Sequence, residues 1–473
     1  MTPRKGFTKY IKVPEVSDPL KQIHQHAAGI DVHAREHFVA VPVGSPPSDF
    51  VNPQPNLPPF VRVFGTNTPD LEELALWLRQ CGVTTVALQA TGVYHLALVD
   101  VLEKHQLEVI IVDPRQTAYA PGRPKTDVLE CQWIQRLHAY GLLRASFVPS
   151  REIRKLRSYQ RQRDMLIRYA ASHVQHMQKA LELMNCKLTE TVKDVVGVTG
   201  MNIIKAIVGG ERDPRKLAAY RQGNCKATVA EFEAALQGTW QEDYVFELKQ
   251  MLLLYEEYQR RLLACEEQIE ACLQRFADCS EGRKLAPRKR SRMKNAVHFD
   301  LRELLLKMAG VDVTALEGVD ETTALVLLSE TGPDLSAFRS SRHFTSWLGL
   351  SPNHRGSGGK LHRRRVKPSA SRANRAFRLA ASGCHHAKNA LGAFYRRLAV
   401  RIGSAKALVA TARKIAVRYY ELLTNKQEYV RQDPNAYEAT YKQKLARGLA
   451  KRAAELGYQL VPIPTTEAAP APA

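Results

Sequence analysis

The spacing of hydrophobic residues changes along the chain, and each spacing predicts a different kind of structure. Between residues 27 and 140, short apolar runs alternate with amphipathic segments in the order strand, strand, strand, helix, strand, helix, strand, helix. The fourth and fifth strands are continuous apolar runs, which is typical of parallel strands that are buried on both faces. This part of the chain is therefore predicted to be a mixed α/β domain.

The bounds of these elements follow from the ends of the apolar runs and from glycine and proline residues. The expected strands cover residues 27–34, 36–43, 61–66, 84–90 and 107–113, and the expected helices begin near residues 69, 92 and 127. A proline-rich stretch at 44–60 is expected to be an inserted loop. Three antiparallel strands followed by parallel strands with crossover helices is the order of an RNase H-like domain.

Two later segments, 151–184 and 248–276, carry apolar residues at every third or fourth position. They predict two long helices with a coiled-coil seam, which form an antiparallel stalk or a dimerisation element. Arg163 interrupts the first series as a polar residue on the apolar stripe. Cys265 and Cys272 are seven residues apart in the second series, so we expect them to be buried seam residues rather than metal ligands.

The last third of the chain is predicted to be mostly helical. Gly318 permits a turn and Asp320 can cap the helix that follows it, while Ser369 or Ser371 can cap a later helix. The expected organisation is an N-terminal extension at 1–26, the α/β domain at 27–148, the coiled-coil region at 149–277, a flexible basic linker at 278–300, a basic C-terminal domain at 301–460 and a disordered tail at 461–473.

Positive charge is concentrated in one segment of this chain, whose net charge is +22. Between Leu335 and Tyr420 there are 19 Lys and Arg residues and no Asp or Glu, whereas the rest of the chain carries a net charge of only +3. A solvated surface usually mixes both signs. A folded segment of one sign predicts a surface that meets a polyanion, which we expect to be nucleic acid.

Composition limits the class of protein. The hydrophobic content of 44% and the charged content of 25% are those of a globular protein. No apolar run reaches the roughly 18 residues that span a bilayer, and the basic first residues lack the apolar stretch of a secretory signal. The eight cysteines form no Cys-x-x-Cys pair. We therefore expect reduced thiols in a cytoplasmic protein, without a zinc knuckle or a disulfide framework.

Acidic residues fall where nucleases of the RNase H fold bind Mg²⁺, at the ends of central strands and on a later helix. Asp31 lies inside an apolar strand, where a carboxylate is costly unless it is ligated or paired. Gln89 ends the fourth predicted strand, and Asp127 and Glu130 share one face of the last helix. An alternative role for Asp127 is the N-cap of that helix, with Glu130 as its capping-box partner.

One hydroxyl, that of Ser357, lies among glycines and basic residues near the C-terminus. Glycines let a phosphate approach the backbone amides, and serine attack on a phosphodiester requires compensation of charge. The alternative is a flexible loop that grips phosphate, in which the serine is incidental. The residues expected to contact nucleic acid are Arg355, Lys360, Arg363, Arg364, Arg365, Lys367, Arg372, Arg375 and Arg378.

Several stretches, in chain order from His26 to about residue 400, resemble one family. They are HAAGIDVHAREHFVAVPVG, ATGVY, PGRPKTDVLECQWIQRLHAYGLLRASFVP, HVQHMQKALELMN, GVTGMNIIKAIVGGERDP, LLSETGPDLSAF, HFTSWLGLSPNHRGSGGK and LGAFYRRL. On these motifs the sequence is similar to transposases of the insertion sequence one-ten family, and more closely to its one-eleven-eleven subgroup.

The resemblance implies an enzyme that cleaves and transfers DNA strands. It implies a RuvC-like domain with an Asp-Glu-Asp-Asp quartet, a coiled-coil region, and a transposase domain whose serine becomes covalently linked to DNA. It also implies dependence on Mg²⁺, guidance by a structured bridge RNA that pairs with donor and target DNA, and assembly as a dimer of dimers with shared active sites. By position, Asp31 matches the first acidic residue, Asp127 the third and Ser357 the nucleophile. A bacterial cytoplasmic protein, bound to the nucleoid with its DNA, is expected.

Two positions depart from the family's quartet. Gln89 stands where the family usually has Glu, and Glu130 where it usually has the last Asp. Three carboxylates and the carbonyl oxygen of Gln89 can still hold a metal ion, more weakly. The sequence therefore leaves three functions open: an RNA-guided serine recombinase, a metal-only nuclease or resolvase in which Ser357 grips phosphate, and a nucleic-acid-binding protein that has lost catalysis.

Overall fold

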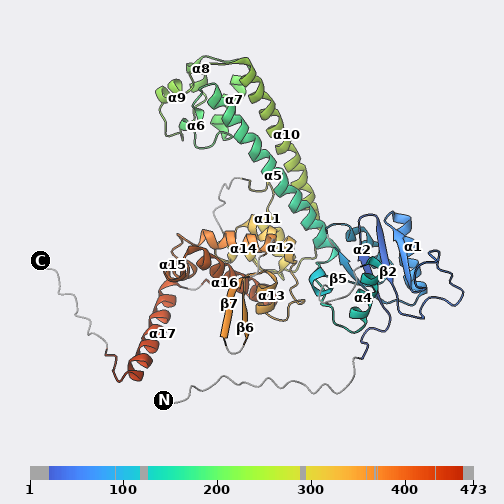
Figure 1. The fold of residues 1–473 in the computed structure, drawn as a ribbon. Coiled ribbons are helices and arrows are strands. Elements are labelled where there is room, and N and C mark those ends of the chain that lie inside the picture. The colour runs from blue at the N-terminus through green and yellow to red at the C-terminus, as the bar shows by residue number, and fades with distance from the viewer. Residues whose placement is uncertain are drawn as a thin grey trace. The chain divides into compact units, whose positions relative to one another are not determined.

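The chain forms two compact units. The structure is a computed structural model, and it describes residues 21–90, 92–117, 126–287, 295–357, 360–366, 369, 371–431 and 433–461, without the side chains of residues 90, 353–357 and 360–365. The first unit ends at Val148 and the second begins at Pro149 (Figure 1).

A five-stranded sheet and its helices make up the first unit. The strands are β1 (Ala27–Val32), β2 (Glu36–Ala40), β3 (Val61–Gly65), β4 (Thr85–Ala90) and β5 (Glu108–Val112), and the helices are α1 (Thr68–Gln80), α2 (His95–Lys104), α3 (Pro114–Thr117) and α4 (Asp127–Ala139). The strand order is β3-β2-β1-β4-β5, in which β1 to β3 pair antiparallel and β1, β4 and β5 pair parallel. The predicted mixed α/β class and the order of its main elements are confirmed, and the short helix α3 is an addition.

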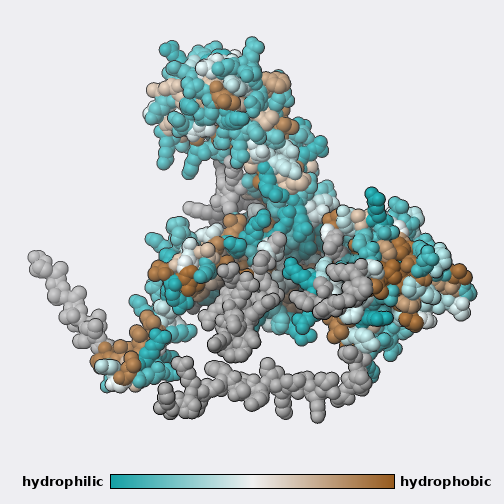
Figure 2. Space-filling model, viewed as in Figure 1, coloured by the Kyte–Doolittle hydropathy of each residue, from teal (hydrophilic) through white to brown (hydrophobic). Residues whose placement is uncertain are grey.

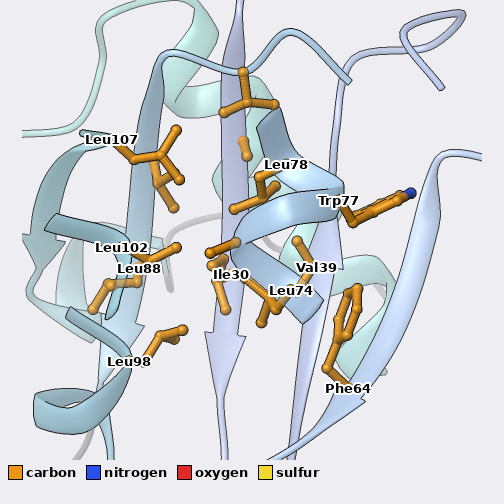
Figure 3. Packing of buried hydrophobic residues seen from close by; sticks show 14 of the residues in the cluster. Ile30, Val39, Phe64, Leu74, Trp77, Leu78, Leu88, Leu98, Leu102 and Leu107 are labelled. Carbon is orange, nitrogen blue, oxygen red and sulfur yellow. The ribbon is translucent and has the colours of Figure 1, made fainter. Parts of the chain in front are cut away.

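Helices cover both faces of this sheet, which explains the apolar strands. On one face, α1 and α2 bury side chains of the three central strands in a single cluster (Figure 3). Its labelled members include Ile30, Val39 and Leu88 from the strands and Leu74, Trp77, Leu98 and Leu102 from the helices. Each such side chain stabilises the fold by about 1.5–3 kcal/mol relative to exposure. On the other face α4 packs against β1 and β2, so a carboxylate in β1 needs a specific reason to be there.

Two long helices form a stalk in the second unit, and the predicted pair is confirmed. α5 (Arg151–Leu183) and α10 (Glu242–Leu273) pack along each other (Figure 1), with Cys265 and Cys272 buried in the seam as expected. The tip consists of α6 (Leu188–Thr191), α7 (Val198–Val208), α8 (Pro214–Ala218) and α9 (Val229–Ala235), and it has its own hydrophobic core. Figure 2 shows a mostly hydrophilic stalk surface, with isolated hydrophobic side chains.

The polar break in the apolar stripe of α5, Arg163, is fully buried. Its Nε donates to Glu266 Oε1 of α10 at 2.8 Å, and its Nη2 donates to the backbone carbonyl of Asn295 at 2.6 Å. Glu266 also accepts from the backbone N–H of His298 at 3.3 Å, and its Oε2 lies 2.8 Å from the ring Nδ1 of that histidine. Each partner is therefore paired and hydrogen-bonded, as burial of charge requires, although Arg163 Nη1 is buried without a hydrogen-bond partner among the described residues.

Arginine pairs fasten the base of α5 to the helices that follow in the chain. Arg161 binds Glu330 of α12 (Glu321–Thr331) with two hydrogen bonds of 2.9 Å, and Arg157 donates to the backbone carbonyl of Glu330 at 2.6 Å. Arg372, at the start of α14 (Arg372–Gly383), pairs with Asp164 at 3.1 Å. These contacts all fall within the first half of α5.

Helices and one hairpin make up the rest of the second unit. They are α11 (Leu301–Ala309), a 3₁₀ turn (Val313–Ala315), α12, α13 (Ser341–Trp347), β6 (Pro352–Ser357), β7 (Lys360–Val366), α14, α15 (Ala390–Ile402), α16 (Ser404–Asn425) and α17 (Pro434–Glu455). Phe344 stacks on Tyr419 at the centre, and the hydroxyl of Tyr419 lies 2.8 Å from that of Thr331. Asp320 caps α12 and Ser371 caps α14, as predicted.

Two segments for which the sequence suggested flexibility make defined backbone contacts. In the segment 278–300, two described residues contact the end of α11. The N–H of Cys279 donates to the carbonyl of Lys307 at 2.8 Å, and Arg283 donates to the carbonyl of Gly310 at 2.5 Å, because the last carbonyls of α11 need donors. The residues around Ser357 form the paired strands β6 and β7 rather than a flexible loop.

The remaining expectations about the ends of the chain stay largely untested. Residues 1–20 and 462–473, which include most of the predicted extension and tail, lie outside the described residues.

Among the helices that the structure describes, none combines the length and the apolar character needed to cross a membrane.

Candidate active site

A close approach between β1 and α4 brings the first acidic residue to its place. A Cβ added at Gly29 would lie 2.2 Å from the backbone nitrogen of Gln135 and 2.5 Å from the backbone carbonyl of Cys131, so only glycine fits. The next residue of β1 on the same face is Asp31. Its side chain is buried beside the first turns of α4, where the carboxylates of Asp127 and Glu130 act on it electrostatically.

The N-cap of α4 is Thr126, whose hydroxyl accepts the N–H of Leu129 at 3.3 Å. The alternative in which Asp127 is the N-cap and Glu130 its capping-box partner is therefore wrong. Asp127 is the first residue of the helix, and its side chain is half exposed. Both carboxylates are thus left for a role other than capping.

His33 lies between two carboxylates, those of Asp31 and Asp127, and was not predicted from the sequence as a site residue. Its Nε2 lies 3.1 Å from Asp31 Oδ2 and 3.5 Å from Asp127 Oδ1. One ligand atom from each of the three residues lies within 4.8 Å of the other two. The available signal was spacing, because residues two apart in an extended chain face the same side and His33 follows Asp31 by two.

Electrostatics at this cluster favour a bound cation. Burial raises the pKa of Asp31, His33 opposes that shift, and the carboxylates of Glu130 and Asp127 add to it. Two carboxylates, those of Asp31 and Asp127, therefore meet at one imidazole, and the charge of Glu130 acts on Asp31. A divalent cation would stabilise the ionised carboxylates, and their oxygens are the ligands that hard divalent cations prefer. The residues present fit a metal ion.

Gln89 lies next to Asp31 in the sheet, as its Cα partner in the parallel pair of β1 and β4. Its Oε1 accepts a hydrogen bond from the hydroxyl of Thr117, and the carbonyl of Thr117 accepts from the indole N–H of Trp133 at 3.1 Å. The amide oxygen that would serve as a ligand is thus engaged by a hydroxyl. Of the four predicted metal residues, Asp31 and Asp127 share the cluster with His33, Glu130 interacts with Asp31, and Gln89 is adjacent.

Ser357 is the last residue of β6, and its backbone partner in the hairpin is Lys360. The other facing positions include Arg355 with Arg363, His354 with Arg364 and Asn353 with Arg365, with an irregularity after Arg355. Like charges directly opposite each other destabilise a pair of strands. The backbone register therefore sets basic positions of the two strands opposite each other.

The predicted nucleic-acid contacts have different surroundings. Arg375 and Arg378 are exposed on α14, whereas Arg372 is engaged by Asp164. Lys367 lies outside the described residues. For Ser357 and for Arg355, Lys360, Arg363, Arg364 and Arg365 the structure describes the backbone alone.

Two family models match the chain. Residues 28–186 match a model described as a transposase, whose name carries both DEDD and IS110, and residues 312–396 match the model of the transposase IS116/IS110/IS902 family. The first match contains the acidic cluster, and the second contains the hairpin with Ser357. No curated protein matches the chain.

The acidic cluster and these matches define a transposase, a DNA-binding enzyme that cleaves and transfers DNA strands and uses a divalent metal ion. The two matched segments together cover just over half of the chain and belong to one family. The protein is a member of the IS110 family of transposases.

Proposed function

We propose that this transposase cuts and rejoins DNA with Ser357 as the nucleophile, assisted by a Mg²⁺ site in an RNase H-like, RuvC-like first unit. The observation that carries the proposal is the convergence of Asp31 and Asp127, from a central strand and a later helix, at His33. The sheet order β3-β2-β1-β4-β5, with Asp31 on its middle strand, supports the RNase H-like assignment.

In this proposal Asp31, Asp127 and Glu130 would hold the cation, with Gln89 as the fourth residue of the set. The bound ion supplies Lewis-acid stabilisation of charge on the phosphate oxygens. The buried position of Asp31 keeps this carboxylate fixed in orientation, and the exposed side of Asp127 leaves room for a phosphate.

The serine chemistry is a transesterification. The Ser357 Oγ bonds to phosphorus while the bond from phosphorus to one deoxyribose oxygen breaks. The hydroxyl proton passes to a base, and the leaving oxygen takes up a proton to become a hydroxyl. A hydroxyl from another strand end then attacks the serine phosphodiester, which rejoins the DNA and releases the serine. The facing basic residues of β6 and β7 stabilise negative charge in both steps.

Choice of DNA site is proposed to come from a structured bridge RNA that pairs with donor and target DNA, as the family resemblance implies. The basic segment from Leu335 to Tyr420 would bind phosphates without reading sequence. Assembly as a dimer of dimers would let protomers share active sites. The setting would be the bacterial cytoplasm, with the protein on the nucleoid when bound to DNA.

The test uses the purified full chain with its RNA, Mg²⁺ and a nicked DNA substrate that traps a covalent intermediate. We expect a protein–DNA adduct that is lost in Ser357→Ala and kept in Ser382→Ala, since Ser382 offers an exposed hydroxyl on α14. RNA binding should be unchanged in both variants. Full recombination by Ser357→Ala would refute the serine mechanism.

A second candidate is a metal-only nuclease, and the DEDD in the name of the first matched family model favours it. It predicts DNA cleavage without an adduct, tolerance of Ser357→Ala and loss of cleavage in Asp31→Asn. The same gel that resolves the adduct separates the two candidates.

A further inference from the structure

The acidic site has a feature that the letters DEDD do not include, an imidazole directed at two carboxylates from different elements. We infer that His33 is a metal ligand and that, together with Gln89 in place of a carboxylate, it makes the site prefer Mn²⁺ to Mg²⁺. The inference rests on the proposed function only in taking the acidic cluster as a metal site.

The distances fit ligands around one ion. With metal–ligand bonds of about 2.1 Å, neighbouring ligand atoms lie about 3.0 Å apart in an octahedron and about 3.4 Å apart in a tetrahedron. The observed separations are 3.1 Å from His33 Nε2 to Asp31 Oδ2 and 3.5 Å to Asp127 Oδ1. A local hydrogen bond explains the short distance from His33 to Asp31, because these residues are two apart in the chain. It does not explain the distance from His33 to Asp127, which lies on α4.

The imidazole is held in this orientation by its surroundings. The ring of His33 packs edge-on against Phe38, with centroids 5.8 Å apart, and Phe38 is the strand partner of Asp31. The backbone N–H of His33 donates to the carbonyl of Glu36 at 3.2 Å, which closes the turn between β1 and β2. The side chain is 41% exposed, so an ion bound there keeps positions open for substrate oxygens.

The choice of metal follows from the ligand types. Mg²⁺ favours all-oxygen sites, whereas an imidazole ligand raises affinity for transition metals. Mn²⁺ shares the preference of Mg²⁺ for carboxylates and also accepts nitrogen. Gln89 weakens the all-oxygen alternative, because it carries no charge and its oxygen already accepts from Thr117.

The experiment measures metal binding to the full chain without DNA. Electron paramagnetic resonance follows free Mn²⁺ during a titration, and pulsed measurements detect a directly bound ¹⁴N nucleus. We expect a ¹⁴N coupling in the native protein, and Mn²⁺ binding roughly tenfold or more tighter than Mg²⁺ binding in competition. His33→Ala should remove the coupling and most of that preference.

His105→Ala is the matched control, because His105 also pairs with a carboxylate, Glu72, at 2.6 Å. It precedes β5, and thus lies toward the opposite end of the parallel strands from Asp31. The variant should keep both the coupling and the preference. His33→Asn retains a side chain that can hydrogen-bond to Asp31 but ligates through oxygen, so it should bind Mn²⁺ without the coupling. Gln89→Glu should shift the preference toward Mg²⁺.

Absence of a ¹⁴N coupling in the native protein would overturn the inference, as would a coupling that persists in His33→Ala. Either result leaves the serine mechanism standing, since that mechanism is decided by the Ser357 adduct. If the native protein forms no adduct with DNA but shows the nitrogen coupling, the serine mechanism is refuted and the metal preference stands.

Discussion

The buried pair of Arg163 and Glu266 makes a quantitative prediction about the stalk. Arg163 is fully buried and Glu266 is 3% exposed, so removing one partner leaves the other charge in an apolar seam. Arg163→Met and Glu266→Leu should each destabilise the stalk by about 3–5 kcal/mol. The Arg163→Met/Glu266→Leu double variant leaves no unpaired charge in the seam. It removes only the hydrogen-bond partners of the Asn295 carbonyl and the His298 N–H. It should cost only about 1–3 kcal/mol.

The prediction is a coupling, so it requires a double-mutant cycle. Hydrogen exchange read on peptides from α5 and α10 gives the free energy of opening of the stalk itself, which a global unfolding curve of a chain with two units does not. We expect the double variant to be several kcal/mol more stable than the sum of the single variants implies. Additive costs, or single costs below about 1 kcal/mol, would refute the view that the two buried charges depend on each other within the seam.

Three further predictions concern the first unit and DNA binding. Gly29→Ala forces α4 away from β1, so DNA cleavage should fall by on the order of 100-fold and thermal stability should be lower. Gly223→Ala, which has open space around the added Cβ, should change neither quantity. Normal cleavage by Gly29→Ala would contradict the close approach of β1 and α4. Burial lowers the pKa of His138 to about 4, so the unfolded chain binds the proton more readily between pH 6.5 and 4. The first unit should therefore lose stability as the pH falls through that window, and His138→Gln should flatten the trend in melting curves. Replacing both Arg375 and Arg378 with Ala should reduce the slope of log K against log salt for duplex DNA by about 2 in a filter-binding series, and an unchanged slope would remove these residues from the interface.

Much of the fold could be predicted from the sequence because its elements are apolar and periodic. β1 and β4 are buried between helices on both faces, so their composition alone identifies them, and Asp31 stands out against it. The stripe of α5 likewise predicts a long helix. The partner of Arg163 could not be predicted, because Glu266 is 103 residues away and nothing in either helix specifies which residues face each other.

The candidate site was less predictable for local reasons. The sequences of β6 and β7 contain few apolar residues, so periodicity gives no sign of strands, and the Gly358–Gly359 pair in the sequence was the available turn signal. Thr126 and Asp127 are both good capping residues, and only the structure distinguishes them. His33 required attention to its spacing from Asp31 rather than to a family motif.

The arginine pairs at the base of α5 have a mechanical consequence. The ion pairs to α12 and α14 end at Asp164, and α5 then continues to Leu183 alongside α10. That stretch of about five turns is roughly 28 Å long. The stalk is thus held by ion pairs at its base, and a tilt of the two long helices by about 10° there would displace the tip by about 5 Å. Small adjustments at the base would therefore displace the four short helices of the tip, α6 to α9, by more than the rise of one base-pair step.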